Sequence, residues 1–284
     1  MSVIRSIDHA VIAAHDLAAL ATFWRQLGFQ VSSQNVHPWG SRNHIIQFAG
    51  HFIELIGAGD AAAASAAPYF ADRLLAYLAQ REGMAMLALT STDAAADAIA
   101  FAKAGVGAAP VFSFSRTGTG AEDTAREVAF DLAFAASTLL SAASFFTCHH
   151  RHPENFWAAT QQAHPNGICA LCSVIMIAAD PADHAEFLST VTGQREMLAT
   201  SFGLDLQLDA AHLEVMSQPA WRFASGLTAV AEPARFVGLR LVVPNLPSLA
   251  ARLGLEHIPF AWHGHRLVIA PEAAFGLALL FEAA

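Results

Sequence analysis

The clearest feature of the chain is a pattern of apolar and polar positions that occurs four times. In the first copy, residues 7–14 (IDHAVIAA) are apolar enough for a buried strand. Asp16 follows as a helix N-cap, because its carboxylate can accept the free N–H groups of a first helical turn. The apolar residues within 17–27 then fall on one helical face, and Gly28 ends the helix. The pattern predicts a strand followed by a short amphipathic helix.

The same succession of strand, cap and helix occurs three more times, with Asp93, Asp180 and Asn245 as the predicted caps. After each helix come short strand candidates separated by turn residues, so each unit is predicted to be β-α-β-β-β. An open sheet of this kind cannot cover its own apolar face, so the units are expected to pair. The predicted fold class is α+β, with four βαβββ modules arranged as two paired half-barrels.

Composition and charge narrow the range of partners. The chain is 55% apolar and 14% charged, and its net charge is −9. The acidic balance and the lack of a basic stripe argue against nucleic acid and against anionic membranes. The longest uncharged apolar stretch, residues 132–148, falls short of the roughly 20 residues that span a bilayer. We therefore expect a small-molecule partner, with no nucleic acid and no membrane.

The N-terminal residues and the cysteines bear on location. Asp8, His9 and Asp16 interrupt the region in which a signal peptide needs unbroken apolar residues. The three cysteines form no disulfide framework. A cytoplasmic protein is expected, and the sequence carries no signal for a nucleotide cofactor.

Several local motifs resemble those of a known superfamily. They are Ile7-Asp8-His9 with Asp16-Leu17, Leu27-Gly28-Phe29, and FIELI at 52–56. In this arrangement the chain resembles the vicinal oxygen chelate superfamily, the glyoxalase/bleomycin-resistance/extradiol-dioxygenase group. More narrowly, the chain is similar to the glyoxalase-like-domain proteins. Four further motifs carry this similarity: HPWGSRNH at 37–44, FSR at 114–116, FFTCHHRHPENFW at 145–157 and HPNG at 164–167.

The resemblance covers nearly the whole chain and implies a domain organisation. Modules one and two would pair over residues 1–152, and modules three and four over residues 168–284, with a linker at 153–167. Each pair would enclose a cavity able to hold one metal ion. The C-terminal pair is expected to be structural, and homodimerisation is left open.

In this superfamily, ligands come from the first and last strands of paired modules. The ligand position on the first strand of a module lies seven residues before the helix cap. The last strand of each module offers one further candidate ligand. The first pair then presents His9, Glu54, Met86 and His149. The second pair presents Ser173, Glu214, Gly238 and Leu280, a set too poor in donors for a divalent ion.

The resemblance thus makes His9, Glu54 and His149 the predicted ligands of a divalent metal (Fe, Mn, Zn or Ni), with Glu54 and His149 as the catalytic residues. Strand alternation alone does not decide whether His149 or His150 faces the cavity, and the register of the family favours His149. Without a metal, His9 and Glu54 could form a hydrogen-bonded network in which Glu54 acts as a base.

Substrate-binding candidates come mainly from the loop VHPWGSRNH. There Trp39 offers an apolar platform, Arg42 a planar donor fork, and Asn43 a mixed donor and acceptor, although an ordinary solvated turn explains the loop as well. The full set of predicted substrate contacts is His37, Trp39, Arg42, Asn43, Met86, Arg116, Phe156 and Trp157.

Two classes of function follow from these residues. The first is a glyoxalase-like enzyme with metal-dependent lyase, isomerase or dioxygenase chemistry on a small oxygen-bearing organic substrate. The second is a metal-free binding protein like the drug-sequestering, bleomycin-resistance members of the superfamily, for which Trp39, Phe156 and Trp157 would matter more than His9 and Glu54. A third is a scaffold whose own side chains fill the cavity.

Overall fold

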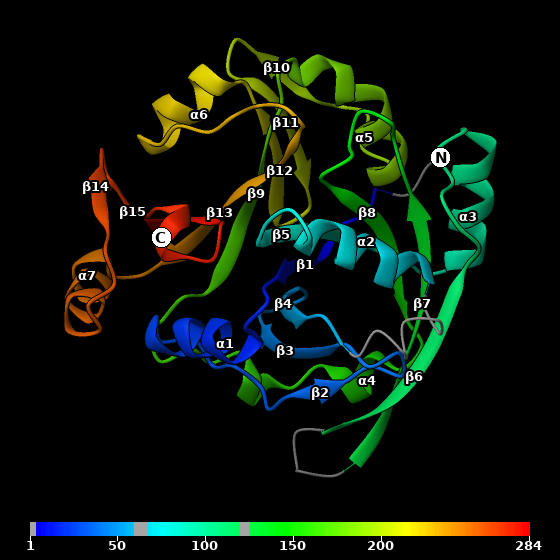
Figure 1. Ribbon diagram of the computed structural model, residues 1–284, viewed down its shortest axis with the longest axis horizontal. Helices are drawn as coiled ribbons and strands as arrows, with labels where there is room; N and C mark the ends of the chain where they lie inside the picture. The colour runs from blue at the N-terminus through cyan, green and yellow to red at the C-terminus, as the bar shows by residue number, and fades with distance from the viewer. Residues whose placement is uncertain (1–3, 60–67, 120–124) are drawn as a thin grey trace.

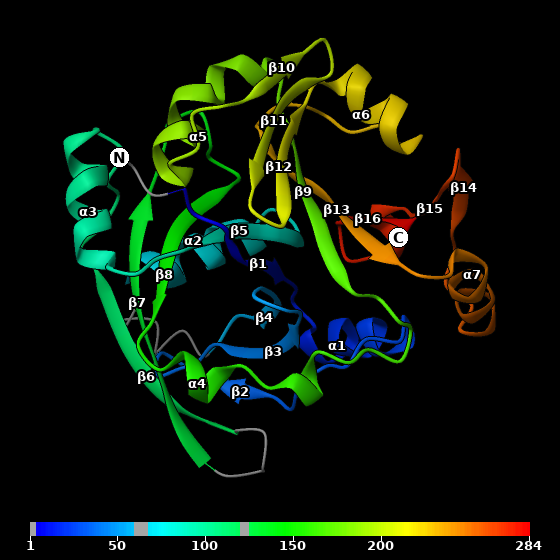
Figure 2. The same ribbon diagram turned by 180° about the vertical axis from the view of Figure 1, so that it is seen from behind.

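A computed structural model describes residues 4–59, 68–119 and 125–284, and within these residues the strands form two eight-stranded sheets. The first sheet has the order β2-β3-β4-β1-β5-β8-β7-β6, and the second has the order β10-β11-β12-β9-β13-β16-β15-β14 (Figure 1, Figure 2). The strands of the first sheet are β1 (Ile7–Ala13), β2 (Asn35–Val36), β3 (Arg42–Gln47), β4 (Phe52–Gly57), β5 (Gly83–Thr90), β6 (Phe112–Thr119), β7 (Ala125–Ala135) and β8 (Ser144–His150). Those of the second are β9 (Ala170–Ile177), β10 (Leu198–Thr200), β11 (Gly203–Leu208), β12 (Ala211–Met216), β13 (Arg235–Val243), β14 (Ala261–His263), β15 (Arg266–Ile269) and β16 (Ala278–Ala283).

Each sheet is built from two modules that join through their first strands. In the first sheet, β1 pairs in parallel with β4 of its own module and antiparallel with β5 of the next. β9 pairs in the same way with β12 and β13 in the second sheet. The predicted α+β fold of four βαβββ modules in two pairs is confirmed.

The predicted caps begin the module helices. Asp16, Asp93, Asp180 and Asn245 each accept a backbone N–H two or three residues later, at 2.8–2.9 Å. The helices are α1 (Leu17–Gln26), α2 (Pro68–Leu78), α3 (Ala94–Lys103), α4 (Pro153–Phe156), α5 (Ala185–Thr192), α6 (Gln218–Ser225) and α7 (Leu246–Leu255), with 3-10 turns η2 (Ala159–Gln161), η3 (Pro181–His184) and η4 (Pro271–Ala273).

The two halves share one core. Trp24 of α1 and Phe145 of β8 belong to the same buried cluster as Phe187 of α5 and Phe236 of β13. The Phe145 ring lies 5.4 Å from Phe187 and 5.5 Å from Phe236 between centroids. This apolar contact fixes one half against the other. None of the helices in the described residues is long and apolar enough to span a membrane.

The other face of each sheet carries an inserted helix, α2 in the first half and α6 in the second. In the second half, Trp221 of α6 is fully buried against β13. A Cβ at Gly238 would lie only 2.9 Å from the Trp221 ring, so a larger residue there would displace the indole. Trp221 thus occupies the space in front of Gly238 in the second half, and the first half has a cavity.

Candidate functional site

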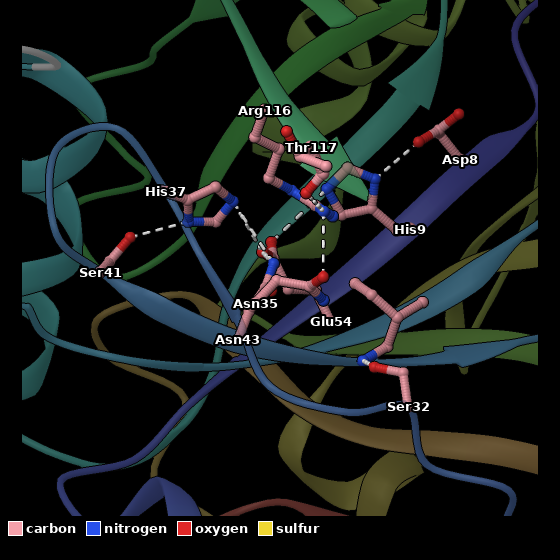
Figure 3. Close-up of polar contacts among 11 residues, drawn as sticks. Asp8, His9, Ser32, Asn35, His37, Ser41, Asn43, Glu54, Arg116 and Thr117 are labelled. Carbon is pink, nitrogen blue, oxygen red and sulfur yellow. Dashed lines mark hydrogen bonds and ion pairs between the residues drawn. The ribbon is translucent and has the colours of Figure 1, made fainter. Parts of the chain in front are cut away.

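The first half contains a cavity whose wall is polar on one part and apolar on the other. Polar side chains come from β1, β3, β4, β6 and the loop before β3 (Figure 3). The remainder of the wall is mainly apolar, and most of its side chains are aromatic. The residues that line it are His9, His37, Trp39, Asn43, Ile45, Phe52, Glu54, Phe70, Phe114, Arg116, Phe130, Leu132, Phe146, Cys148 and Phe156. Such a wall suits a small ligand with one polar end.

A bulge in β1 sets the position of His9. Against β5, Ile7 is opposite Leu89 and His9 is opposite Ala88, so Asp8 is an extra residue in β1. The Asp8 carboxylate lies 2.6 Å from His9 Nδ1. A carboxylate only accepts, so Nδ1 donates its hydrogen to Asp8, and Nε2 is the nitrogen that faces Glu54. The ring of His9 also stacks on Phe52, with centroids 4.2 Å apart.

Glu54 lies beside His9 because β4 runs parallel to β1. Its side chain is buried, with Oε2 at 3.8 Å from His9 Nε2 and Oε1 at 3.6 Å from His37 Nε2. Asn43 donates from Nδ2 to Oε1, as Figure 3 shows. One carboxylate oxygen is thereby held by an amide, and the other faces an imidazole.

The loop that contains His37 is ordered by its own hydrogen bonds. His37 Nδ1 lies 2.8 Å from Ser41 Oγ, and Asn43 Nδ2 lies 3.3 Å from His37 Nε2. Trp39 stacks on the His37 ring at 4.4 Å. Burial lowers the pKa of His37 to about 4, against the opposing charge of Glu54, so the ring is neutral at pH 7. The structure therefore favours the interpretation of this loop as a buried wall of the cavity over its interpretation as an ordinary solvated turn.

Arg116 brings a cation to the same wall. Its NH1 donates to Asn35 Oδ1 at 3.0 Å, and its Nε is buried without a protein partner. Burial lowers the pKa of the guanidinium, the charge of Glu54 opposes that change, and an arginine stays protonated near neutral pH. Trp39 Nε1 and Asn43 Oδ1 are buried and unpartnered as well. Three polar atoms of the residues that line the cavity thus have no hydrogen-bond partner within the described protein.

Of the remaining predicted substrate contacts, some lie at the cavity and others do not. Phe156 of α4 lines the cavity. Trp157 packs behind it against Phe52 and His150, with centroid distances of 6.0 Å and 5.8 Å. Met86 is fully buried in the core. Arg42 is exposed at the start of β3, because its neighbour Asn43 takes the inward position of the strand.

His149 does not join His9 and Glu54. Along β8, Phe146 and Cys148 line the cavity, and the alternation of the strand turns His149 to the opposite face. There its Nδ1 lies 3.6 Å from Asp131, and 31% of its side chain is exposed. The prediction that His149 faces the cavity is therefore wrong, and His150 is the histidine on the inward side.

The pairing register locates the position that corresponds to Glu54 in the second module. Glu54 is opposite Val11, two residues after His9, and Phe146 is opposite Ala88, two residues after Met86. The equivalent residue is thus Phe146, three positions before His149. The register counted from the sequence failed because β8 continues past that position to His150.

The residues at the expected ligand positions do not fit a tightly bound divalent ion. They are His9, Met86, Glu54 and Phe146, and only His9 and Glu54 carry a nitrogen or oxygen donor. Asn43 already occupies one Glu54 oxygen, and the Arg116 cation lies in the same wall. Tight Zn or Fe sites use three or more protein donors.

A different set of three side chains, beside the expected ligand positions, could hold a metal ion. Asp8, Cys148 and His150 present ligand atoms that all lie within 4.8 Å of one another. His150 Nε2 lies 3.1 Å from Asp8 Oδ2. Burial raises the pKa of Asp8, but the charge of His150 and the hydrogen bonds from His150 and His9 outweigh it, so the net pKa is below its usual range.

The corresponding positions of the second half form an ion-pair network. Ser173 Oγ donates to Glu214 at 2.5 Å, and Arg240 lies 2.9 Å from the same carboxylate. Arg240 neutralises Glu214, and Trp221 fills the space in front of β13. The structural role expected for this half stays a prediction.

The paired half-barrels have the fold of the vicinal oxygen chelate superfamily. A family model described as "Glyoxalase-like domain" matches residues 7–192, and the chain belongs to that family. A search of the curated proteins found no match.

Solved structures agree on the fold at low sequence identity. A hypothetical protein from Staphylococcus aureus has a TM-score of 0.68 and 10% identity, over 99% of this chain and 100% of that one. The Mn(II)-bound glyoxalase from Novosphingobium aromaticivorans has a TM-score of 0.58 and 11% identity, over 100% and 83%. A mutant 4-hydroxymandelate synthase from Streptomyces coelicolor has a TM-score of 0.57 and 11% identity, over 99% and 92%.

Proposed function

We propose that this protein is an enzyme that moves a proton on a small, anionic, oxygen-bearing substrate bound in the cavity of the first half. The observation that carries the proposal is the pair of free acid–base atoms at its polar end. Glu54 Oε2 and His9 Nε2 lie 3.8 Å apart, and both belong to residues that line the cavity. A positioned acid or base of this kind contributes roughly 10²–10⁴-fold to a rate.

The roles of the two groups follow from their partners. The amide of Asn43 holds the Glu54 carboxylate in place, so Oε2 can take a proton from a carbon next to a carbonyl group. Glu54 can pass this proton to His9 Nε2, which lies 3.8 Å from Oε2. The imidazolium that forms is stabilised by Asp8 and returns the proton to a neighbouring atom of the substrate. This arrangement favours isomerase or lyase chemistry.

The negative charge that develops on the substrate oxygen would be stabilised by Arg116. Its guanidinium lies in the same wall as Glu54, away from bulk water, where a fixed positive charge acts strongly. The unpartnered Trp39 Nε1 and Asn43 Oδ1 would bind the other polar atoms of the substrate. The aromatic part of the wall would take its apolar end.

The metal-dependent form of the prediction, with Fe, Mn, Zn or Ni held by His9, Glu54 and His149, has less support. His149 faces Asp131 on the other side of β8, and Phe146 takes the position of the missing ligand. Dioxygenase chemistry at His9 and Glu54 is therefore less favoured than isomerase or lyase chemistry. The cytoplasmic location and homodimerisation stay predictions.

A metal-free binding protein is the alternative. Nine of the fifteen residues that line the cavity are apolar, and six of those are phenylalanines, which would hold an aromatic ligand without any reaction. Trp39 in the wall makes ligand binding visible by quenching of tryptophan fluorescence.

The test is hydrogen exchange at carbon in D2O, followed by NMR, with a panel of 2-oxo acids and 2-hydroxy ketones. The protein should accelerate exchange of at least one compound, and Glu54→Gln should reduce that acceleration by roughly 10²–10⁴-fold. Glu214→Gln is the matched control, because it removes the equivalent carboxylate of the second half. If compounds bind with fluorescence quenching but none exchanges, the binding alternative replaces the enzyme.

A further inference from the structure

Three chemically different side chains meet beside the acid–base pair, and one of them, Asp8, also orients His9. Asp8 comes from the bulge of β1, and Cys148 and His150 come from the end of β8. The two strands are not neighbours, because β5 separates them. The bulge turns Asp8 toward β8, and the alternation of β8 puts Cys148 and His150 on one face. A carboxylate oxygen, a thiol sulfur and an imidazole nitrogen thus lie within 4.8 Å of one another.

We propose that Asp8, Cys148 and His150 form a Zn²⁺ site beside the cavity, separate from the position where His9 and Glu54 meet. Carboxylate, thiolate and imidazole are the three ligand types that Zn²⁺ uses in proteins. Bonds of about 2.0–2.3 Å place tetrahedral ligand atoms roughly 3.3–3.8 Å apart. The 3.1 Å between Asp8 Oδ2 and His150 Nε2 is close to that range already.

The burial of the three groups favours a cation between them. Asp8 and Cys148 are each 3% exposed, and the His150 side chain is 9% exposed. His150 is surrounded by Phe130 and Phe156, each at 4.9 Å between ring centroids. In such an apolar environment, a carboxylate and a thiolate together balance the charge of Zn²⁺ and hold it strongly.

Binding of the ion releases one proton. The thiol of Cys148 loses its hydrogen to solvent as the Zn–S bond forms, and His150 binds through Nε2 as a neutral ring with its hydrogen on Nδ1. Burial raises the pKa of the Cys148 thiol, and the charges of Asp8 and Glu54 raise it further. Affinity should therefore increase with pH. Asp8 Oδ1 stays available to His9 Nδ1, so the site leaves the acid–base pair intact.

The test uses Co(II) as a spectroscopic substitute for Zn²⁺ on the full-length, tag-free protein after treatment with a chelator. A cysteine ligand gives a sulfur-to-cobalt charge-transfer band in the near ultraviolet. We expect this band to saturate at one Co(II) per chain, to be lost in Cys148→Ser and in Asp8→Asn, and to disappear when Zn²⁺ is added. A wild-type protein without the band overturns the proposal.

Two control variants show which residues hold the ion. Cys172→Ser changes a partly buried cysteine of β9 in the second half, whose thiol contacts Arg240 and Glu282, and should keep the band. Glu54→Gln should keep it as well, although it abolishes the proposed proton transfer, so the two proposals fail independently. Loss of the band in either control overturns the assignment. Circular dichroism spectra and thermal midpoints of each variant show that it is folded, and Zn²⁺ should raise the midpoint of the wild type but not that of Cys148→Ser.

Discussion

The Asp8 carboxylate lies 2.6 Å from Nδ1 of its chain neighbour His9, although residues next to each other in a strand normally point to opposite faces. The bulge between Ile7 and His9 makes this contact possible. It fixes which nitrogen of His9 carries the hydrogen, and so which nitrogen faces Glu54.

Asp8→Asn should therefore impair both catalysis and folding. The amide cannot stabilise an imidazolium at His9, and the hydrogen bonds from His9 and His150 lose their charged acceptor. We expect the rate of the exchange reaction to fall by at least about 10²-fold and the free energy of unfolding at pH 7 to fall by roughly 1–3 kcal/mol. Asp131→Asn, which changes the Asp–His pair on the outer side of β8, should leave the rate unchanged. Equal losses in both variants would contradict the role of Asp8.

His149 and His150 are adjacent in the chain and should respond very differently to substitution. His149→Ala removes a partly exposed side chain, so the free energy of unfolding should change by less than about 0.5 kcal/mol. His150→Ala removes a ring that contacts Asp8, Phe130 and Phe156, and should cost roughly 1–3 kcal/mol. Urea denaturation of the two variants measures the difference. A larger loss in His149→Ala would contradict the assigned orientation of β8.

Arg116 and Arg42 form a second matched pair. Arg116→Ala should weaken the binding of an anionic ligand by roughly 10- to 100-fold, because a charged hydrogen-bond donor is lost from a buried wall. Arg42→Ala removes an exposed arginine and should change the affinity by less than about threefold. Titration with a ligand from the exchange panel, followed by tryptophan fluorescence, compares the two. Similar losses would indicate a binding site outside the cavity.

The buried histidines predict loss of stability in weak acid. The pKa of His37 is lowered from 6.5 to about 4 by burial, so between these values the unfolded chain binds a proton that the folded protein does not. The free energy of unfolding should then fall as the pH falls, by on the order of 2 kcal/mol for His37 between pH 6.5 and 5. His51, with its pKa also lowered to about 4, adds to the effect.

Urea denaturation at several pH values measures this slope. His37→Gln should reduce it, and a change of the exposed His15 to Gln should not. An unchanged slope in His37→Gln would mean that His37 is already protonated in the folded protein.

The architecture could be predicted from the sequence because its determinants are local. Asp16, Asp93, Asp180 and Asn245 cap helices through atoms two or three residues away, and the apolar strands around them follow a fixed period. His9 could be selected for the site because it lies seven residues before the cap Asp16. Glu54, Trp39 and Asn43 could be selected because their motifs resemble those of the family.

Which side chains meet was decided by the tertiary structure. The sequence alone does not show the bulge that brings Asp8 beside His9, or the length of β8 that turns His149 outward and puts Phe146 at the position of a ligand. A shift of one residue in a strand moves every side chain to the other face, and that register is set by pairing between distant strands. The helices and modules were thus determined by neighbours in the chain. The composition of the site was determined by contacts between residues up to 142 positions apart, such as Asp8 and His150.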